Sequence, residues 1–421
     1  MIRAENTVSG VSTEQLNAAL DGWLERAKSY KKVLIVAPDI TRFYSRAGII
    51  TSRLYEKLSP FCKVDVLIAL GSHVPMTQKE AKRMYPAVPY ERIINHNWRQ
   101  DVEKLGQVPA GFVREVSGGL CDFSIDVEIN RLITSDYDAV LSIGQVVPHE
   151  VVGMANGNKN LFVGCGGASM INSSHMLGAV CDMEKVMGRD FSPVRKVFDY
   201  AERKYLGGVN VHYFQTVISN DNMIGLYISE GREAFESAVK TCQENNIVFL
   251  DEPIQKVVVY LEPEEFRSTW LGNKAIYRTR MAIADGGELI VIAKGVERFG
   301  EDEAIDLLIR KYGYIGRARV LEAAQNNDDL KGNLSAAAHL IHGSSDGRFK
   351  ITYAVSKLSR EEVEQVNFNY ADYEETVKRY DPEKLTCGFN TVDGERVFYI
   401  SNPALGLWAC RDKFFADKKK N

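Results

Sequence analysis

The sequence predicts an α/β fold made of two α/β domains with mostly parallel sheets. The chain has 421 residues, which is more than one hydrophobic core usually spans. Short, continuous apolar runs alternate with segments of helical spacing, and this alternation is typical of parallel sheets. The alternation resumes near residues 255–270. We therefore expect one domain at residues 1–262 and a second at 263–421, whose last segment packs back on the first domain.

The first domain is predicted to begin with a helix that leads into a strand, helix, strand unit. Within "VSTEQLNAALDGWLERA", Leu16, Leu20 and Leu24 share one helix face, and Ser12 or Thr13 is placed to cap its start. The segments that follow are predicted, in order, as strand, helix, strand and strand: "KKVLIVAPDITR", "AGIITSRLYEKLSPFC", "VDVLIALGSH" and "YDAVLSIGQVVPHE".

The rest of the chain repeats this alternation. "HMLGAVCDMEKVMGRDFSPVRKVFDYAERKY" has a helical composition, and "VNVHYFQTVIS" alternates like a strand. The second region begins around "VVVYLEPEEF". We expect it to carry a helix in "NKAIYRTRMAIA", a turn in "DGGE", a strand in "LIVIAK" and a helix in "EDEAIDLLIRKYG".

Composition and charge exclude several classes of partner. The formal net charge of -4 gives no electrostatic reason to expect nucleic acid. No apolar run approaches the ~18–20 residues of a membrane span, and "MIRAENTVSG" lacks the features of a signal peptide. The seven cysteines are widely scattered and form no CxxC pair, so we expect reduced thiols in a cytoplasmic protein. Small molecules are the expected ligands.

Polar side chains stand at the ends of the three predicted strands of the first domain. Asp39 and Arg42 lie in "DITR", His73 ends "GSH", and His149 lies in "VPHE". Ligand sites of open parallel sheets gather beyond the carboxyl ends of the strands, so we expect these four residues to converge. Two imidazoles suit a reaction that removes and returns hydrogen on either face of a carbon. Structural histidines and a surface ion pair between Asp39 and Arg42 are the alternatives.

The loop-rich segment 147–179 holds two further candidates. Lys159 in "GNKN" is either an exposed lysine or a covalent anchor, because an amine forms imine or amide-type links. His175 in "SSHM" either caps a helix or binds a metal such as nickel or zinc. The glycines of "GCGGAS" do not follow a strand with dinucleotide-binding spacing, so we expect them to permit an unusual turn.

Taken together, these positions resemble the nickel-dependent lactate racemase family. The shared motifs are "DITR", "LGSHVPMT", "PHEVVGMANGNK" and "NSSHMLG", with weaker similarity through "NKAIYRTRMAIADGGELIVIAKGVERFG". The order Asp, His, His, Lys, His is specific in combination, as are the spacings from His149 to Lys159 and from Lys159 to His175. The resemblance covers most of the chain. We expect the active site in the cleft between the two domains.

The resemblance implies a cofactor and a role for each candidate residue. The cofactor is a nickel-pincer nucleotide, a nicotinate-derived pyridinium mononucleotide with two sulfur arms, which dedicated biosynthesis proteins make and load. It is covalently attached at Lys159, and His175 completes the coordination of nickel. His73 and His149 are the paired acid/base residues. The remaining assignments are Asp39, Ile40, Thr41 and Arg42 for the cofactor nucleotide, and Arg42, Lys274 and Leu271 for the substrate.

The implied activity is racemisation or epimerisation of a 2-hydroxy acid. One histidine takes the hydroxyl proton as the α-hydrogen leaves as hydride to the cofactor, and the other serves the opposite enantiomer. Lys274 and Arg42 neutralise the substrate carboxylate. Leu271 stands where lactate racemases of the family place a glutamine, "FYSRAG" replaces a proline-rich continuation, and "NGN" replaces Gly-Gly-Arg. A larger or sugar-derived 2-hydroxy acid is therefore as well supported as lactate.

Two other functions remain open from the sequence. A hydrolase or lyase would hold zinc with His73, His149 and His175 and would need no nucleotide cofactor. A noncatalytic homologue would bind a carboxylate without turnover. A plain NAD dehydrogenase is disfavoured because the glycine fingerprint after a strand is missing.

Overall fold

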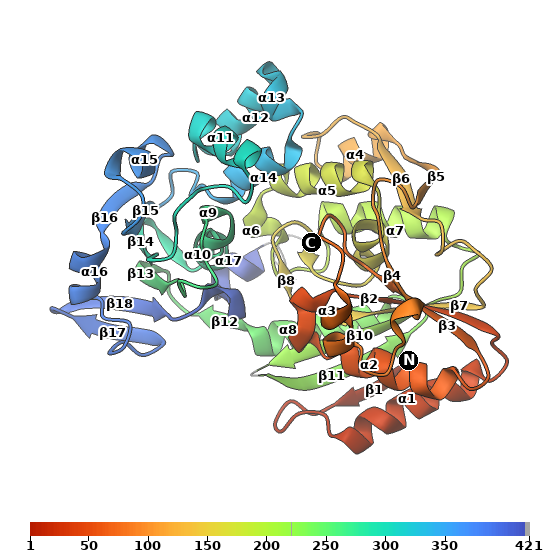
Figure 1. Cartoon of the computed structure of the whole chain (residues 1–421). Coiled ribbons are helices and arrows are strands. Elements are labelled where there is room, and N and C mark those ends of the chain that lie inside the picture. The colour runs from red at the N-terminus through yellow and green to blue at the C-terminus, as the bar shows by residue number, and fades with distance from the viewer. Residues whose placement is uncertain (220, 417–421) are drawn as a thin grey trace. The chain divides into compact units, whose positions relative to one another are not determined.

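The computed structural model describes residues 1–219 and 221–416 (Figure 1). The chain forms two compact units. The first unit contains Met1–Leu177 and Val186–Asn245, and the second contains Gly178–Lys185 and the chain from Asn246 onward. Each unit combines helices with a mostly parallel sheet, as the sequence predicts.

A seven-stranded sheet forms the centre of the first unit. Parallel pairing joins the five strands on one side of it, and two antiparallel strands complete the other edge. The predicted strands are three neighbours within it (Figure 1), so their carboxyl ends lie together. The order across the sheet is β1 (Ile2–Glu5), β11 (Asn222–Ser229), β10 (Val211–Ser219), β7 (Ala139–Gln145), β2 (Lys32–Ala37), β3 (Lys63–Ile68) and β4 (Ile93–Asn95).

The first helix, α1 (Thr13–Ala27), begins where the sequence predicts. The Ser12 hydroxyl accepts a hydrogen bond from the Gln15 amide, and the Gln15 side chain accepts one from the Ser12 amide. This capping box fixes the start of the helix. Leu16 and Leu20 are buried in one core with the neighbouring strands.

The remaining elements of the first unit surround this sheet or connect its strands. They are the helices α2 (Ala47–Leu58), α3 (Gln78–Met84), α4 (Ala110–Val116), α5 (Ala168–Val180), α6 (Met183–Val186), α7 (Pro193–Tyr205) and α8 (Glu233–Asn246), the strand pairs β5 (Val102–Val108) with β6 (Ile125–Asn130) and β8 (Pro148–His149) with β9 (Gly153–Met154), the 3-10 turns η1 (Ile40–Ser45) and η2 (Tyr90–Arg92), and the π-helix η3 (Asn160–Gly164). The last turn of α5 and most of α6 fall in the segment that clusters with the second unit.

A six-stranded sheet forms the centre of the second unit. Its strands are parallel except for one edge pair. The order is β16 (Asn369–Asp372), β15 (Lys350–Val355), β14 (Ile283–Ile292), β13 (Ile254–Tyr260), β18 (Glu395–Ile400) and β17 (Gly388–Val392). The other elements are α9 (Thr269–Gly272), α10 (Lys274–Thr279), α11 (Glu303–Tyr312), α12 (Arg317–Asn326), α13 (Asp328–Lys331), α14 (Leu334–His342), α15 (Arg360–Gln365), α16 (Tyr373–Arg379), the 3-10 turn η4 (Pro403–Leu405), α17 (Arg411–Phe415), and the parallel pair β12 (Ile247–Leu250) and β19 (Leu407–Cys410).

The division between the units differs from the one expected between residues 262 and 263. Strand β13 lies inside the second sheet, where it pairs with β14 and β18. The first unit therefore ends at Asn245, and residues 178–185 also belong to the second unit. The last described strand, β19, pairs with β12 within that unit.

The predicted helix over "NKAIYRTRMAIA" is shorter than expected. Helix α10 ends at Thr279, and β14 begins before the "DGGE" turn and includes it. Arg280 explains the break, because its buried guanidinium donates to Glu184 at 3.1 Å and to Asp346 at 3.1 Å. These partners are distant in sequence, so a local helical pattern does not contain them.

Two predictions from composition are tested by the described residues. The seven cysteines all lie among the described residues, where none forms a disulfide and only Cys387 is exposed. Among the helices of residues 1–219 and 221–416, none combines the length and the apolar content that crossing a membrane requires.

Candidate active site

Three neighbouring strands position the first group of candidate residues. Asp39 follows β2, His73 follows β3, and His149 follows β7 in the short strand β8. In the sheet, β3 lies on one side of β2, and β7, which comes later in the chain, lies on the other side. The strand order therefore reverses at β2. In open α/β sheets, ligands bind at such reversals.

Asp39 and His73 meet directly at this end of the sheet. The Nδ1 atom of His73 lies 2.5 Å from Oδ2 of Asp39, and Asp39 also accepts hydrogen bonds from the Thr41 amide, at 2.8 Å, and the Thr41 hydroxyl. Burial would raise the pKa of the Asp39 carboxyl, but the hydrogen bonds from His73 and Thr41 outweigh it and lower that pKa. The ionised carboxylate therefore holds the proton of His73 on Nδ1 and leaves a lone pair on Nε2.

The turn that carries His73 is fixed against the segment after Lys159. The Gly71 amide donates to the carbonyl of Gly164 at 2.8 Å, and Gly71 has a φ of +57°, which favours glycine. The loop after β3 and the π-helix η3 are thus joined by backbone, although they are about ninety residues apart in sequence. This contact brings the predicted strand-end histidine and the predicted anchor segment into one site.

His149 is held with its proton on the other ring nitrogen. Its Nδ1 atom accepts a hydrogen bond from the Val151 amide at 3.1 Å, and the Glu150 carboxylate lies 3.8 Å from the same atom. A nitrogen that accepts from an amide carries no proton, so neutral His149 presents N–H at Nε2. The side chain is largely buried, with 19% exposed, whereas that of His73 is 51% exposed.

Lys159 is a half-buried amine among other charges. Its pKa is lowered to about 8, first by burial and then by the positive charge of Arg42, while the Glu150 carboxylate opposes the shift. Arg42 and Glu150 therefore act electrostatically on the same amine. A lysine in this range is partly uncharged near neutral pH, so it has the lone pair that covalent attachment requires.

His175 presents a metal-binding nitrogen near the same lysine. On α5, its Nδ1 atom lies 2.6 Å from the carbonyl of Ile171, so Nδ1 donates the proton and Nε2 keeps its lone pair. Burial lowers the pKa of the imidazole, and the positive charge of Lys159 acts in the same direction. The neutral ring is the form that ligates a metal.

A buried arginine that the sequence did not single out holds the chain before Lys159. Arg195 of α7 donates to the carbonyl of Met154 at 2.6 Å, to that of Asn156 at 3.0 Å and to Oδ1 of Asn158 at 2.5 Å. Its guanidinium stacks 4.3 Å from the ring centroid of Phe235, and burial lowers its pKa to about 10. The strongest signal in the sequence was an arginine placed among the apolar positions of an amphipathic helix.

The glycine-rich run forms a turn, as expected, and not a dinucleotide-binding loop. A Cβ atom on Gly166 would lie 1.8 Å from the carbonyl oxygen of Phe162, and one on Gly167 would lie 2.3 Å from the Glu128 carboxylate. Glycine is needed at 166 because the backbone of Phe162 approaches closely, whereas at 167 it leaves room for the Glu128 side chain. Glu150 is a second residue that the sequence did not single out, although it is adjacent to His149 in "PHEV".

Ile40, Lys274 and Leu271 complete the candidates. Ile40, in η1, packs at the edge of the core of the first unit. In the second unit, Lys274 begins α10 with its amine 5.6 Å from the ring centroid of Phe266, and Leu271 in α9 is half-buried against the core. The site residues of the first unit are thus brought together independently of these two.

The donor groups fit a cofactor that attaches to one amine and needs one imidazole. Lys159 supplies the amine, and Nε2 of His175 supplies the imidazole lone pair. Within residues 1–219 and 221–416, no group of three His, Cys, Asp or Glu side chains is arranged to hold a metal ion. The zinc site expected for a hydrolase, formed by His73, His149 and His175, is therefore not assembled.

Comparison with known proteins matches the same part of the chain. Residues 16–188 match the lactate racemase N-terminal domain family. A lactate racemase from Lactiplantibacillus plantarum is 28% identical over 158 residues, which cover 36% of this chain and 34% of that protein. The match spans about a third of the curated relative. The first-unit residues predicted for acid/base, cofactor or metal roles all fall within the matched segment. They are Asp39, Ile40, Thr41, Arg42, His73, His149, Lys159 and His175.

Two solved structures share the fold. A protein from Thermotoga maritima is 25% identical with a TM-score of 0.79, and the similarity covers 97% of this chain and 100% of that one. The lactate racemase apoprotein from Thermoanaerobacterium thermosaccharolyticum is 18% identical with a TM-score of 0.70, over 95% of this chain and 90% of that one. Both comparisons extend over the two units.

Proposed function

We propose that the chain is a racemase or epimerase of a 2-hydroxy acid, because its residues 16–188 match the lactate racemase N-terminal domain family. The observation that carries the proposal is the opposite tautomers of His73 and His149. His73 offers a lone pair at Nε2, and His149 offers N–H at the corresponding atom. Removing the hydroxyl proton of a substrate needs a lone pair such as that of His73, and an N–H such as that of His149 can donate a hydrogen bond to the same oxygen.

His73 is the residue prepared to take the hydroxyl proton. The Asp39 carboxylate on its Nδ1 side stabilises the imidazolium that forms, in the same way as the carboxylate of a catalytic triad. His149 donates a hydrogen bond from Nε2 to the substrate oxygen, and it returns a proton to that oxygen only from the imidazolium form, in which Nδ1 also carries a proton. For His149 to act as the base in its turn, its proton must move to Nδ1, and the Glu150 carboxylate at 3.8 Å from that atom is the acceptor nearby.

The nickel-pincer nucleotide is the cofactor that we propose for this site. When bound, it would supply the acceptor for the hydrogen that leaves the α-carbon. Lys159 would hold it covalently, His175 would ligate its nickel through Nε2, and the strand-end segment 39–42 would bind its nucleotide part. The positive charge of Arg42, already close enough to act on Lys159, suits a phosphate or a carboxylate.

Substrate and cellular setting follow from the same reasoning. We propose that Lys274 binds the substrate carboxylate and that Leu271, in place of a glutamine, admits a 2-hydroxy acid other than lactate. Cysteines without disulfides fit a reducing compartment, so we propose a cytoplasmic enzyme. We also propose that it depends on proteins that make and load the cofactor.

The test is the intact mass and nickel content of protein made in cells that supply the cofactor, followed by a screen of 2-hydroxy acids for loss of optical rotation. We expect a mass adduct with nickel and racemisation by the wild-type protein. Lys159→Ala is expected to lose the adduct, and Lys28→Ala, at an exposed position directly after α1, is expected to keep it. An unmodified, nickel-free wild-type protein that stabilises on a carboxylate without turning it over would support the noncatalytic alternative.

A further inference from the structure

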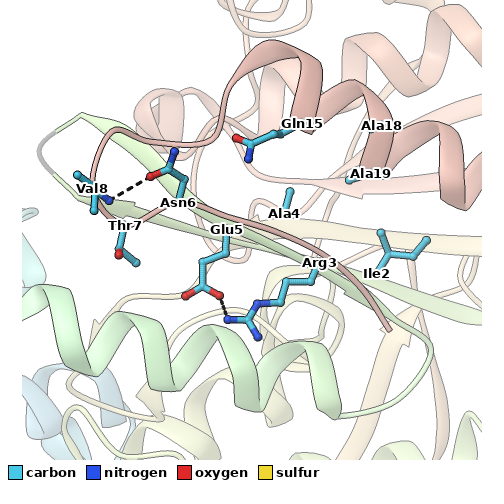
Figure 2. Close-up of a pocket in the computed structure, with 10 residues that line it drawn as sticks. All are labelled: Ile2, Arg3, Ala4, Glu5, Asn6, Thr7, Val8, Gln15, Ala18 and Ala19. Atoms are coloured by element: carbon cyan, nitrogen blue, oxygen red, sulfur yellow. Dashed lines mark hydrogen bonds and ion pairs between the residues drawn. The ribbon is translucent and has the colours of Figure 1, made fainter.

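Strand β1 occupies one edge of the seven-stranded sheet, and within the described chain it pairs only with β11. We propose that this edge is a docking surface for a second copy of the chain, with the two β1 strands antiparallel. A hollow of about 800 Å³ runs along it, lined by residues 2–8 and by Gln15, Ala18 and Ala19 of α1 (Figure 2). An edge strand with an open side is a template for another strand.

The pairing with β11 determines which backbone groups face outward. The Asn6 amide donates to the carbonyl of Ile224, in the same register that places Ala4 opposite Leu226. In antiparallel pairs, hydrogen-bonded and non-hydrogen-bonded positions alternate, so Ala4 bonds inward and Arg3 and Glu5 direct their N–H and C=O groups to the open side. Two copies related by a twofold axis at Ala4 would exchange four hydrogen bonds through Arg3 and Glu5.

Side-chain charge makes this register self-complementary. Arg3 and Glu5 point to the same side of β1 and form an ion pair (Figure 2). The axis at Ala4 places Arg3 of each copy opposite Glu5 of the other, which adds two cross-strand pairs of opposite charge. Ala4 faces its own counterpart at the non-hydrogen-bonded position, where the Cα atoms of the two strands approach most closely, and its small side chain fits there.

Other registers are disfavoured by the same two charges. Sliding the strands by two residues places either Arg3 opposite Arg3 or Glu5 opposite Glu5, and like charges directly opposite destabilise a pair. Charged residues on an edge normally deter pairing with unrelated strands. Here their spacing deters unrelated strands and permits the chain's own strand, which is why we assign a second copy as the occupant.

The neighbouring helix leaves room for this approach. Ala18 and Gly22 are exposed on α1 beside the strand, and a Cβ atom on Gly22 would have Ile2 Cδ1 as its neighbour at 3.8 Å. Short side chains therefore flank this stretch of the edge. The exposed apolar side chains Met1 (57%) and Val8 (96%) stand at its two ends and would lose contact with water on pairing.

The test is sedimentation velocity on the full chain over a wide concentration range. We expect a species of twice the 47.2 kDa chain mass. Arg3→Glu and Glu5→Arg, made separately, each place like charges opposite one another at two symmetry-related positions, so each is expected to weaken the dimer by ~10-fold or more. Lys28→Glu changes charge equally at the other end of α1 and is expected to leave the dimer intact.

Mixing the two variants separates the proposal from a folding defect. Two carboxylates on one strand then face two guanidinium groups on the other, so the mixture is expected to dimerise more tightly than either variant alone. A wild-type protein that is monomeric throughout, a dimer that both variants retain, or a mixture that stays monomeric while the wild-type protein dimerises would each overturn the proposal. If the wild-type protein is monomeric throughout, the edge of β1 would remain open for pairing with a peptide of another protein.

Discussion

Asp39 holds His73 through a 2.5 Å contact between Oδ2 and Nδ1, and the two residues lie at the ends of adjacent parallel strands. The carboxylate fixes the tautomer of the imidazole and stabilises its charged form. His149 has a different neighbour, because Glu150 lies 3.8 Å from its Nδ1 atom and the Val151 amide bonds that nitrogen. The two histidines are therefore prepared unequally for proton transfer.

Replacing Asp39 tests this preparation directly. In cofactor-loaded protein, Asp39→Asn is expected to lower kcat/KM by about 10²-fold or more, because the amide favours the wrong tautomer and stabilises no imidazolium. Thr41→Val removes one hydrogen bond to the same carboxylate and is expected to have a much smaller effect. An Asp39→Asn enzyme with full activity would show that His73 is not the base.

Glu150→Gln is the matched change beside the other histidine. We expect it to lower kcat/KM less than Asp39→Asn does, because Glu150 is not in hydrogen-bonding contact with Nδ1 of His149. The equilibrium constant between two enantiomers is one, so for a true racemase each variant must lower kcat/KM equally from both enantiomers. Polarimetry from each pure enantiomer measures this. A ratio of the two kcat/KM values that stays constant among the variants but differs from one would indicate an epimerase.

The strand-end residues were predictable because parallel strands place their carboxyl ends at one edge, and sequence marks each strand by its apolar run. The pair of Asp39 and His73 was found in this way. Arg195 was not, since its partners are backbone carbonyls that no side-chain pattern encodes. The compact units divide after Asn245 and not between residues 262 and 263, because β13 pairs with β14, and an apolar run alone does not show which sheet a strand joins.

The lowered pKa of Lys159, about 8, predicts how the protein without cofactor responds to pH. An ordinary lysine has a pKa of ~10.4, so between these values the unfolded chain binds a proton that the folded chain has released. The free energy of unfolding should therefore rise with pH from about 8 to ~10.4 through this residue. Denaturant unfolding at several pH values should show this rise in the wild-type protein relative to Lys159→Met.

Acylation of the same amine gives a site-resolved measurement. Mass-spectrometric peptide mapping of the protein without cofactor should give a labelling midpoint near pH 8 at Lys159. Arg42→Gln removes a positive charge that lowers this pKa, so the midpoint is expected to move upward. A midpoint in the ordinary lysine range in the wild-type protein would contradict the electrostatic account of the site.

Arg195→Met is expected to lower the free energy of unfolding by about 3 kcal/mol, because three oxygens in the segment before Lys159 lose a buried donor. Arg203→Met, on the exposed side of the same helix, is the control and is expected to change it by less than ~0.5 kcal/mol. Chemical denaturation measures both. Equal effects would mean that the arginine does not hold this loop.

Leu271→Gln tests the proposed substrate preference. With Leu271 beside the substrate, as proposed, an amide there would offer a new hydrogen bond to a small polar substrate, and the ratio of kcat/KM for lactate to that for a larger 2-hydroxy acid should rise by about tenfold. Leu271 is half-buried against the core, so the melting temperature must be measured with the kinetics.

Lys274→Ala is expected to raise KM for every 2-hydroxy acid, since the carboxylate is common to all of them, whereas Lys378→Ala on exposed α16 should not. If Lys274→Ala leaves KM unchanged, the carboxylate is bound elsewhere, and Arg42 is the next residue to replace. If Leu271→Gln changes stability but not the ratio of kcat/KM values, specificity is set by other residues.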